Sequence, residues 1–140
     1  MNIHLFDTKS QTLRPLEPVR PGQVGIYVCG PTVQSAPHIG HLRSALSYDL
    51  LRRWFTARGL EVTLIRNVTD IDDKILVNAE QTGEPWWALA YRVERLFNSA
   101  YDQLHILPPT YEPRATANIQ RMQQIISRLI ERRHAYAADD

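Results

Sequence analysis

Apolar residues recur along this chain with two different periods, and their order predicts alternating strands and helices. The apolar run at 24–28 is typical of a buried strand, and residues 61–68 are predicted to form the next strand. Between them, 39–58 has the period of a helix, and its apolar positions share one face: Leu42, Ala45, Leu46, Leu50 and Phe55. A strand, a helix and a strand in this order predict a parallel βαβ unit with a right-handed crossover.

Helical periodicity dominates the rest of the chain. We expect helices at about 70–81, from after Pro85 to about 104, and at about 114–133. The first strand is predicted at 3–6, and the Pro- and Gly-containing stretch 7–23 is predicted to form turns and an edge. The sequence therefore indicates an α/β fold.

Composition places the chain among ordinary globular proteins. Its 140 residues are 44% hydrophobic and 22% charged, which suits one domain with a core of its own. It has no apolar run of the roughly 20 residues that a membrane span needs, and no features of a signal peptide. A single cysteine excludes an internal disulfide, and the net charge of +1 does not indicate nucleic-acid binding. We expect a cytoplasmic protein, and the helical pattern next to the C-terminus suggests a fragment.

The loop between the strand at 24–28 and the following helix carries the strongest chemical signal. His38 and His41 are three residues apart, so both project from the first helical turn, where unpaired N–H groups and the helix dipole favour phosphate. Gly40 lacks a side chain, which lets a flat ligand approach the backbone. The alternative is a pair of surface histidines that cap a helix.

Two further positions lie where the strands end. Cys29 follows the first strand of the βαβ unit, but a lone cysteine is usually a small buried apolar residue, and one thiol cannot complete a tetrahedral zinc site. Thr69 and Asp70 follow the second strand, at the edge where ligands bind open α/β sheets. Capping of the next helix by Thr69 or Asp70 is the competing interpretation. The acidic residues do not form an EF-hand loop, because Lys74 occupies a ligand position.

Several segments together resemble the cysteine-specific class I aminoacyl-tRNA synthetases over essentially the whole chain. They are Leu5-Phe6-Asp7-Thr8, Tyr27-Val28-Cys29-Gly30-Pro31-Thr32-Val33, Pro37-His38-Ile39-Gly40-His41 with the HIGH signature, Arg66-Asn67-Val68-Thr69-Asp70-Ile71-Asp72-Asp73-Lys74, and Glu112-Pro113-Arg114-Ala115-Thr116. The resemblance implies a Rossmann-type parallel sheet in the catalytic half-domain at 1–110, followed at 111–140 by helical residues that begin a connective insertion.

The resemblance also implies a reaction and a set of site residues. Cysteine and ATP would give cysteinyl-adenylate and pyrophosphate, with magnesium accompanying ATP, and the cysteinyl group would pass to tRNA(Cys). The implied catalytic residues are His38 and His41. The implied ATP-binding residues are Thr32, His38, Gly40 and His41. The implied cysteine-binding residues are Gly30, Thr32 and Thr69. Cys29 is the implied zinc ligand, and zinc would take the substrate thiol, which a serine hydroxyl cannot match as a soft ligand.

The chain departs from the family pattern in ways that bear on activity. The other zinc ligands of the family, its lysine-rich KMSKS loop and its anticodon-binding region lie past residue 140, and Gln34-Ser35-Ala36 replaces the usual aromatic and acidic residues. We therefore expect a monomeric N-terminal fragment that is inactive alone. Two alternatives stay open at this point: a mycothiol-pathway cysteine ligase, and a non-catalytic module that binds nucleotide or tRNA.

Overall fold

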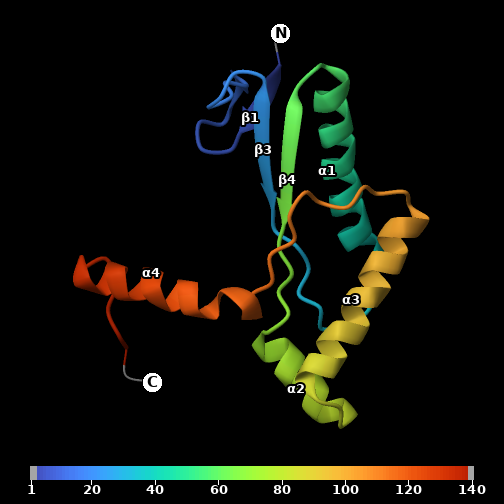
Figure 1. Ribbon diagram of the computed structural model, residues 1–140, viewed down its shortest axis with the longest axis vertical. Helices are drawn as coiled ribbons and strands as arrows, with labels where there is room; N and C mark the ends of the chain where they lie inside the picture. Colours follow the sequence, from blue (N-terminus) through green and yellow to red (C-terminus); the bar gives the residue numbers. More distant parts are fainter. Residues whose placement is uncertain (1–2, 139–140) are drawn as a thin grey trace.

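The computed structural model, which describes residues 3–138, is built around a parallel pair of strands. Strand β3 (Gln23–Val28) pairs with β4 (Glu61–Arg66), and helix α1 (Ile39–Ala57) makes the crossover between them (Figure 1). Gly59 follows the helix with φ +82°, a left-handed conformation that ends a helix at little cost for glycine. The predicted βαβ unit is confirmed, with β4 two residues shorter than the run at 61–68.

A third segment extends the sheet on the other side of β4. The N–H of Arg66 donates to the carbonyl of Tyr111 at 3.2 Å, and the N–H of Val68 donates to the carbonyl of Pro113 at 2.9 Å. Isolated parallel bridges join Ile65 to Tyr111 and Val68 to Arg114. Residues 110–115 therefore run along β4 as an extended segment.

The N-terminal region forms an antiparallel hairpin that the sequence prediction only half described. Strand β1 (His4–Asp7) pairs with β2 (Thr12–Pro15), and both strands are largely exposed. Residues 12–15 were expected to be turn or edge, so the prediction missed β2. Its four residues alternate only weakly and bury little, because the strand depends on pairing with β1 rather than on a core face.

Helices α2 (Asp73–Thr82) and α3 (Trp86–Gln103) form a hairpin whose turn contains Gly83 at φ +68°. The side chain of Asp72 caps α2 by accepting the N–H of Lys74 at 3.0 Å. The expected start at about Asp70 and the expected cap at Thr69 or Asp70 were therefore wrong. Asp70 is buried and accepts from Thr116 instead, at 2.9 Å from the N–H and 2.5 Å from the hydroxyl.

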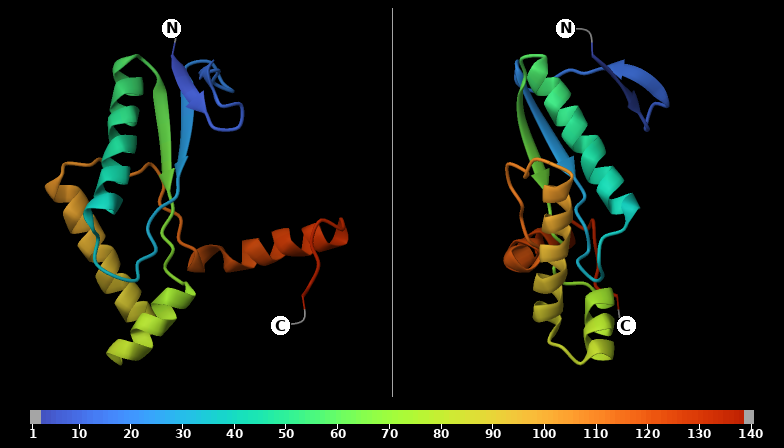
Figure 2. Two further views of the ribbon diagram at one scale, coloured as in Figure 1. Left: turned by 180° about the vertical axis from the view of Figure 1, so that it is seen from behind. Right: turned by 90° about the vertical axis from the view of Figure 1, so that its right-hand side faces the viewer.

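The last helix, α4 (Ile119–Glu131), follows a short 3₁₀ turn at Thr116–Asn118 and extends away from the rest of the molecule (Figures 1 and 2). It begins five residues later than the predicted start at Arg114, because 110–115 is extended along β4. No residue of α4 is buried. No helix in the described part of the chain is long and apolar enough to cross a membrane.

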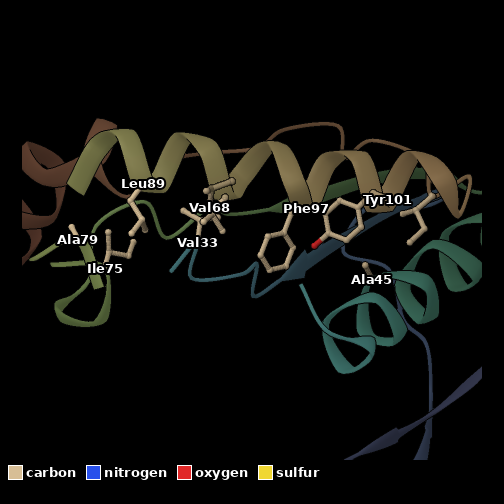
Figure 3. Packing of buried hydrophobic residues seen from close by; sticks show 11 residues of the cluster. Val33, Ala45, Val68, Ile75, Ala79, Leu89, Phe97 and Tyr101 are labelled. Atoms are coloured by element: carbon tan, nitrogen blue, oxygen red, sulfur yellow. The ribbon is translucent and has the colours of Figure 1, made fainter. Parts of the chain in front are cut away.

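The main core lies where α2 and α3 pack against the loops that follow β3 and β4 (Figure 3). Its members are Val33, Ala45, Val68, Ile75, Ala79, Leu89, Ala90, Val93, Phe97, Tyr101 and Ile106. A smaller cluster joins Ile3 and Val24 to Phe55 of α1. Side chains alternate along a strand, so the even-numbered residues of β3 and β4 face α1 and α3 and the odd-numbered ones face the other way.

Candidate functional site

The carboxyl ends of β3 and β4 approach each other closely at Gly30. The N–H of Gly30 donates to Oδ1 of Asn67 at 2.8 Å. A Cβ atom at Gly30 would lie 1.5 Å from the backbone oxygen of Asn67, so only glycine fits this position. Cys29, one residue earlier, follows the last residue of β3 and is exposed.

Thr32 and Thr69 lie side by side beyond the strand ends. They form an isolated parallel bridge, in which Val33 N–H donates to the carbonyl of Thr69 at 3.2 Å and Thr69 N–H donates to the carbonyl of Pro31 at 3.1 Å. The amide of Asn67 reaches the Thr69 hydroxyl at 3.3 Å. The three residues expected to bind cysteine, Gly30, Thr32 and Thr69, are thus brought together by backbone pairing.

The two histidines of the loop close the start of α1 reciprocally. Nδ1 of His38 accepts the N–H of Gly40 at 3.0 Å, and Nδ1 of His41 accepts the N–H of His38 at 3.3 Å. The arrangement is a capping box made from imidazoles, with the ring centroids 3.8 Å apart. The structure therefore confirms that these two histidines cap the helix.

The cap also determines which nitrogen of each neutral ring carries the proton. An Nδ1 atom that accepts a hydrogen bond carries no proton, so each neutral ring carries its proton on Nε2. His41 stacks edge-on against Phe97 with centroids 5.2 Å apart. Partial burial, followed by the neighbouring His38, lowers the pKa of His41 below its usual value. Both histidines therefore present an Nε2–H donor at the helix start, where anions bind.

A small pocket of about 70 Å³ connects the cysteine with the signature histidine. Its lining comes from the ends of β3 and β4, from α1 and from α3: Val28, Cys29, Gly30, Pro31, His41, Ser44, Ala45, Arg66 and Tyr101. The structure thus places Cys29 and His41 at one hollow. Thr32 and Thr69 are close in the sequence to residues that line this pocket, but they do not line the pocket themselves.

Arg66 is a residue of this region that sequence reasoning did not single out. Its side chain is buried, its guanidinium carbon lies 4.2 Å from the ring centroid of Tyr101, and it bonds Glu112 at 3.0 Å. An arginine directly after the apolar residues Leu64 and Ile65 of a predicted strand is the signal that was available. Its place indicates that it holds the end of β4 against α3 and the 110–115 segment.

Two buried carboxylates fix the segment that follows. Asp70 holds Thr116, and Glu94 of α3 accepts a hydrogen bond from Arg114 at 2.6 Å. Burial raises the pKa of Glu94, against the opposing effect of Arg114, and its Oε2 atom is buried without a partner among the described residues. These contacts attach 114–116 to the same region as Thr69.

The residues described here do not form a zinc site by themselves. Cys29 supplies one exposed thiol, and residues 3–138 contain no group of three histidine, cysteine, aspartate or glutamate side chains placed to hold a metal. Four ligands, or three and an open position, are needed for zinc. We therefore derive no chemical step through a metal from this chain.

Comparison with known proteins matches this chain to aminoacyl-tRNA synthetases. A family model described as the class I (C) tRNA synthetase catalytic domain matches residues 15–140. The cysteine–tRNA ligase of Clavibacter michiganensis subsp. michiganensis is 67% identical over 145 residues, which cover 100% of this chain and 30% of that protein. The cysteine–tRNA ligase of Streptomyces avermitilis is 58% identical, over 99% of this chain and 30% of that protein. The chain thus spans about a third of the length of these relatives.

Solved structures give the same fold. A Mycobacterium tuberculosis methionyl-tRNA synthetase in complex with methionyl-adenylate aligns with a TM-score of 0.55 and 25% identity, covering 59% of this chain and 16% of that one. The LeuRS–tRNA–LeuAMS complex of Agrobacterium radiobacter K84 aligns with a TM-score of 0.69 and 20% identity, covering 83% and 16%. The predicted Rossmann-type α/β fold is confirmed, and the chain belongs to the family of class I (C) tRNA synthetase catalytic domains.

Proposed function

We propose that this chain carries the signature half of the active site of a cysteine–tRNA ligase. The observation that carries the proposal is the 67% identity, over the whole chain, to a cysteine–tRNA ligase. The geometry supports it, because Thr32 pairs with Thr69, and Gly30 lines one hollow with His41 at the start of α1.

In the proposed first reaction, the carboxylate of cysteine attacks the α-phosphate of ATP and pyrophosphate leaves. His38 and His41 act as catalytic residues by donating their Nε2–H groups to phosphate oxygens as negative charge develops. Gly40 lets the nucleotide approach the helix start, and Thr32 completes the ATP site. Magnesium accompanies the ATP phosphates. The chain mainly orients the reactants and stabilises charge.

We assign the amino-acid pocket to Gly30, Thr32 and Thr69, with Cys29 at its mouth. Gly30 lies so close to the backbone of Asn67 that no side chain fits there, and the Thr69 hydroxyl is oriented by Asn67. Cys29 is proposed as one zinc ligand, with the other ligands supplied from outside these 140 residues. Zinc held in that way would favour a thiol substrate over a hydroxyl.

In the second reaction, a ribose hydroxyl of the tRNA(Cys) 3′ end attacks the adenylate carbonyl and AMP leaves. We propose a cytoplasmic, monomeric enzyme, since ATP and tRNA are found together in that compartment. The division into a catalytic half-domain at 1–110 and a connective region from 111 onwards is part of the same proposal. Residues 110–115 lie along β4, at the boundary between the two.

Cysteine-dependent exchange of pyrophosphate into ATP tests the proposal. The 140-residue chain and the full-length product of its gene are assayed side by side, and bound zinc is measured in both. We expect exchange and stoichiometric zinc in the full-length product and neither in the 140-residue chain. In the full-length product, His41→Ala should lower the exchange rate by roughly 10²- to 10³-fold, the usual effect of removing one transition-state donor.

His4→Ala is the matched control, because His4 is an exposed histidine in β1, in the N-terminal hairpin. An unchanged exchange rate in His41→Ala would contradict the assigned role. A separate transfer assay on the full-length product, with tRNA as the acceptor in one sample and glucosaminyl-inositol in the other, tests the mycothiol-pathway alternative. ATP or tRNA binding without cysteine-dependent exchange in the full-length product would instead identify a non-catalytic binding module.

A further inference from the structure

Arg66, the last residue of β4, carries a buried charge that takes no part in the reaction steps proposed above. Its side chain is only 8% exposed, and its guanidinium bonds one oxygen of Glu112, with Nη2 at 3.0 Å and Nε at 3.3 Å. A buried ion pair is a poor means of stabilising a fold, because apolar residues of similar volume often do as well or better. The pair is therefore better explained by what it holds in place.

The aliphatic stem of Arg66 supports the strand end that carries Cys29. A Cβ atom at Gly30 would lie 3.2 Å from Cγ of Arg66, so the stem packs directly against Gly30. The N–H of Gly30 also donates to Oδ1 of Asn67 at 2.8 Å. Gly30 is thus fixed by two residues of the neighbouring strand end, and Cys29 precedes it in the chain. The position of the Cys29 thiol therefore depends on the Arg66 stem.

The guanidinium of Arg66 reaches the helices through aromatic contacts. Its carbon lies 4.2 Å from the centroid of the Tyr101 ring, within the range of a cation–π interaction. Tyr101 and Phe97 lie side by side on α3, with centroids 6.0 Å apart (Figure 3). The ring of Phe97 in turn meets the ring of His41 with centroids 5.2 Å apart. Arg66 is thereby connected to the second signature histidine as well as to the cysteine.

Both connections end at the same small hollow. The pocket of about 70 Å³ is lined by Cys29 and Gly30 at the end of β3, by His41 at the start of α1, and also by Arg66 and Tyr101. The arginine therefore meets the same hollow as the thiol and the imidazole. A change in the arginine side chain would alter the separation of these two groups.

We propose that Arg66 is a positioning residue for the attack of the cysteine carboxylate on ATP. The ion pair with Glu112 holds the guanidinium against Tyr101. The stem and the guanidinium together then set the distance between Cys29 and His41. Reacting atoms must approach to about 3–3.5 Å, and a displacement of about 1 Å can cost roughly 10²-fold in rate. The inference rests on the proposed function, because that function supplies the two reactants.

Arg66→Met combined with Glu112→Leu tests the proposal, because the double variant removes both charges and leaves neither one buried alone. The full-length product of the gene is assayed for cysteine-dependent exchange of pyrophosphate into ATP, at varied cysteine and varied ATP. We expect kcat per folded molecule to fall at least about tenfold. The KM values of cysteine and ATP should change less than about threefold, since no group that contacts either substrate is lost. Urea unfolding should show no loss of stability.

Arg66→Lys gives a second test that does not depend on the double variant. Lysine keeps the charge beside Glu112, but it lacks the planar fork that bonds a carboxylate and stacks on a ring. We expect kcat to fall at least about tenfold in this variant too, again with nearly unchanged KM values.

Arg92→Met combined with Glu84→Leu is the matched control. Arg92 of α3 forms the same type of ion pair with Glu84, its side chain is 55% exposed, and neither residue lines the hollow. The kcat of this double variant should equal that of the unsubstituted enzyme, because an ion pair outside the site sets no distance within it.

Three kinetic results would overturn the proposal. The first is an unchanged kcat in both Arg66 variants. The second is a loss of activity fully accounted for by a smaller folded fraction, which would show that the ion pair acts on stability alone. The third is a KM for cysteine or ATP that rises about tenfold or more at unchanged kcat, which would show that Arg66 binds that substrate.

Amide exchange at Gly30 separates this inference from the proposed function, because it needs no activity. In the 140-residue chain, nuclear magnetic resonance should show the Gly30 N–H exchanging at least about tenfold faster in Arg66→Lys. The N–H of Val33, which donates to the carbonyl of Thr69, should change less than about twofold. Equal rates at Gly30 would overturn the positioning role even in an active enzyme. Faster exchange at Gly30, together with a full-length protein that activates no cysteine, would leave the placement by Arg66 intact and overturn the proposed function instead.

Discussion

Two histidine side chains perform both the capping of α1 and the proposed contact with phosphate, and the two roles use different nitrogen atoms. Nδ1 of each ring accepts a backbone N–H of the first helical turn, so Nε2–H is left to donate. A protonated ring has no acceptor nitrogen. A protonated ring could no longer accept the backbone N–H, so protonation of His38 or His41 would break the cap.

We expect the stability of the protein to fall when His41 is protonated. Burial lowers its pKa in the folded protein, whereas in the unfolded chain an imidazole titrates near about 6.5. The unfolded chain then binds more protons, so the stabilisation is fully present above about pH 6.5 and is lost as the pH falls through the lower folded pKa. Urea unfolding at a series of pH values between about 5 and 7.5 measures this slope.

His41→Gln is the informative variant for this prediction. Glutamine at the third position of a helix can accept the N–H of the capping residue, as in an ordinary capping box, and it does not titrate. The variant should keep most of the stability at about pH 7.5 and show a shallower loss of the free energy of unfolding toward about pH 5. An identical slope in both proteins would show that His41 is not the group responsible.

Gly30 gives the sharpest steric prediction in the chain. A Cβ atom there would lie 1.5 Å from the backbone oxygen of Asn67, so Gly30→Ala forces the ends of β3 and β4 apart and weakens the hydrogen bond to the Asn67 side chain. We expect the free energy of unfolding to fall by about 1–3 kcal/mol or more, as in other overpacked sites. Urea denaturation of both proteins measures the difference.

Gly25→Ala is the control for Gly30→Ala. Gly25 also lies in the β3 region, but a Cβ atom there meets nothing within 4 Å. The substitution should leave the free energy of unfolding nearly unchanged or raise it slightly, because alanine restricts the unfolded chain more than glycine does. Equal losses in the two variants would mean that the close approach at Gly30 is not what requires glycine.

At the scale of elements, the hydrophobic periodicity was sufficient to predict a helix or strand wherever that element buries one side. The βαβ unit and the α2–α3 hairpin were predicted to within a few residues because their apolar positions face a core. Strand β2 was missed because it buries almost nothing, and α4 was started too early because 110–115 bonds to β4. Pairing between distant segments leaves little trace in a local pattern.

In the candidate site, too, the order of the elements indicated some residues, whereas contacts between distant segments left others unrecognised. Cys29, Thr69 and the signature histidines lie at element ends, where the order of strands and helices already indicated them, whereas Gly30 was implied only by the family resemblance. Arg66 was not singled out and Asp70 was given the wrong role as a helix cap, because their partners, Glu112 and Thr116, are each 46 residues away in the sequence. Such contacts exist only after the chain has folded, so single positions did not suggest them.

At the scale of the whole molecule, the stabilising contacts are unevenly distributed. Helix α3 buries six side chains: Leu89, Ala90, Val93, Glu94, Phe97 and Tyr101. Helix α4 buries none, and its 13 residues are close to the length at which an isolated helix is marginal in water. The network of Asp70 and Glu94 fixes where α4 begins, whereas the bonds at its far end are local, such as the one from the N–H of His134 to the carbonyl of Leu129.

Hydrogen exchange should therefore separate these two helices. The amides of α3 should exchange only on global unfolding, whereas those of α4 should exchange through local opening at rates orders of magnitude faster. Mass spectrometry of pulse-labelled peptides from 86–103 and 119–131 measures both in one sample, so α3 serves as the internal reference. Protection of α4 equal to that of α3 in the 140-residue chain alone would contradict the prediction.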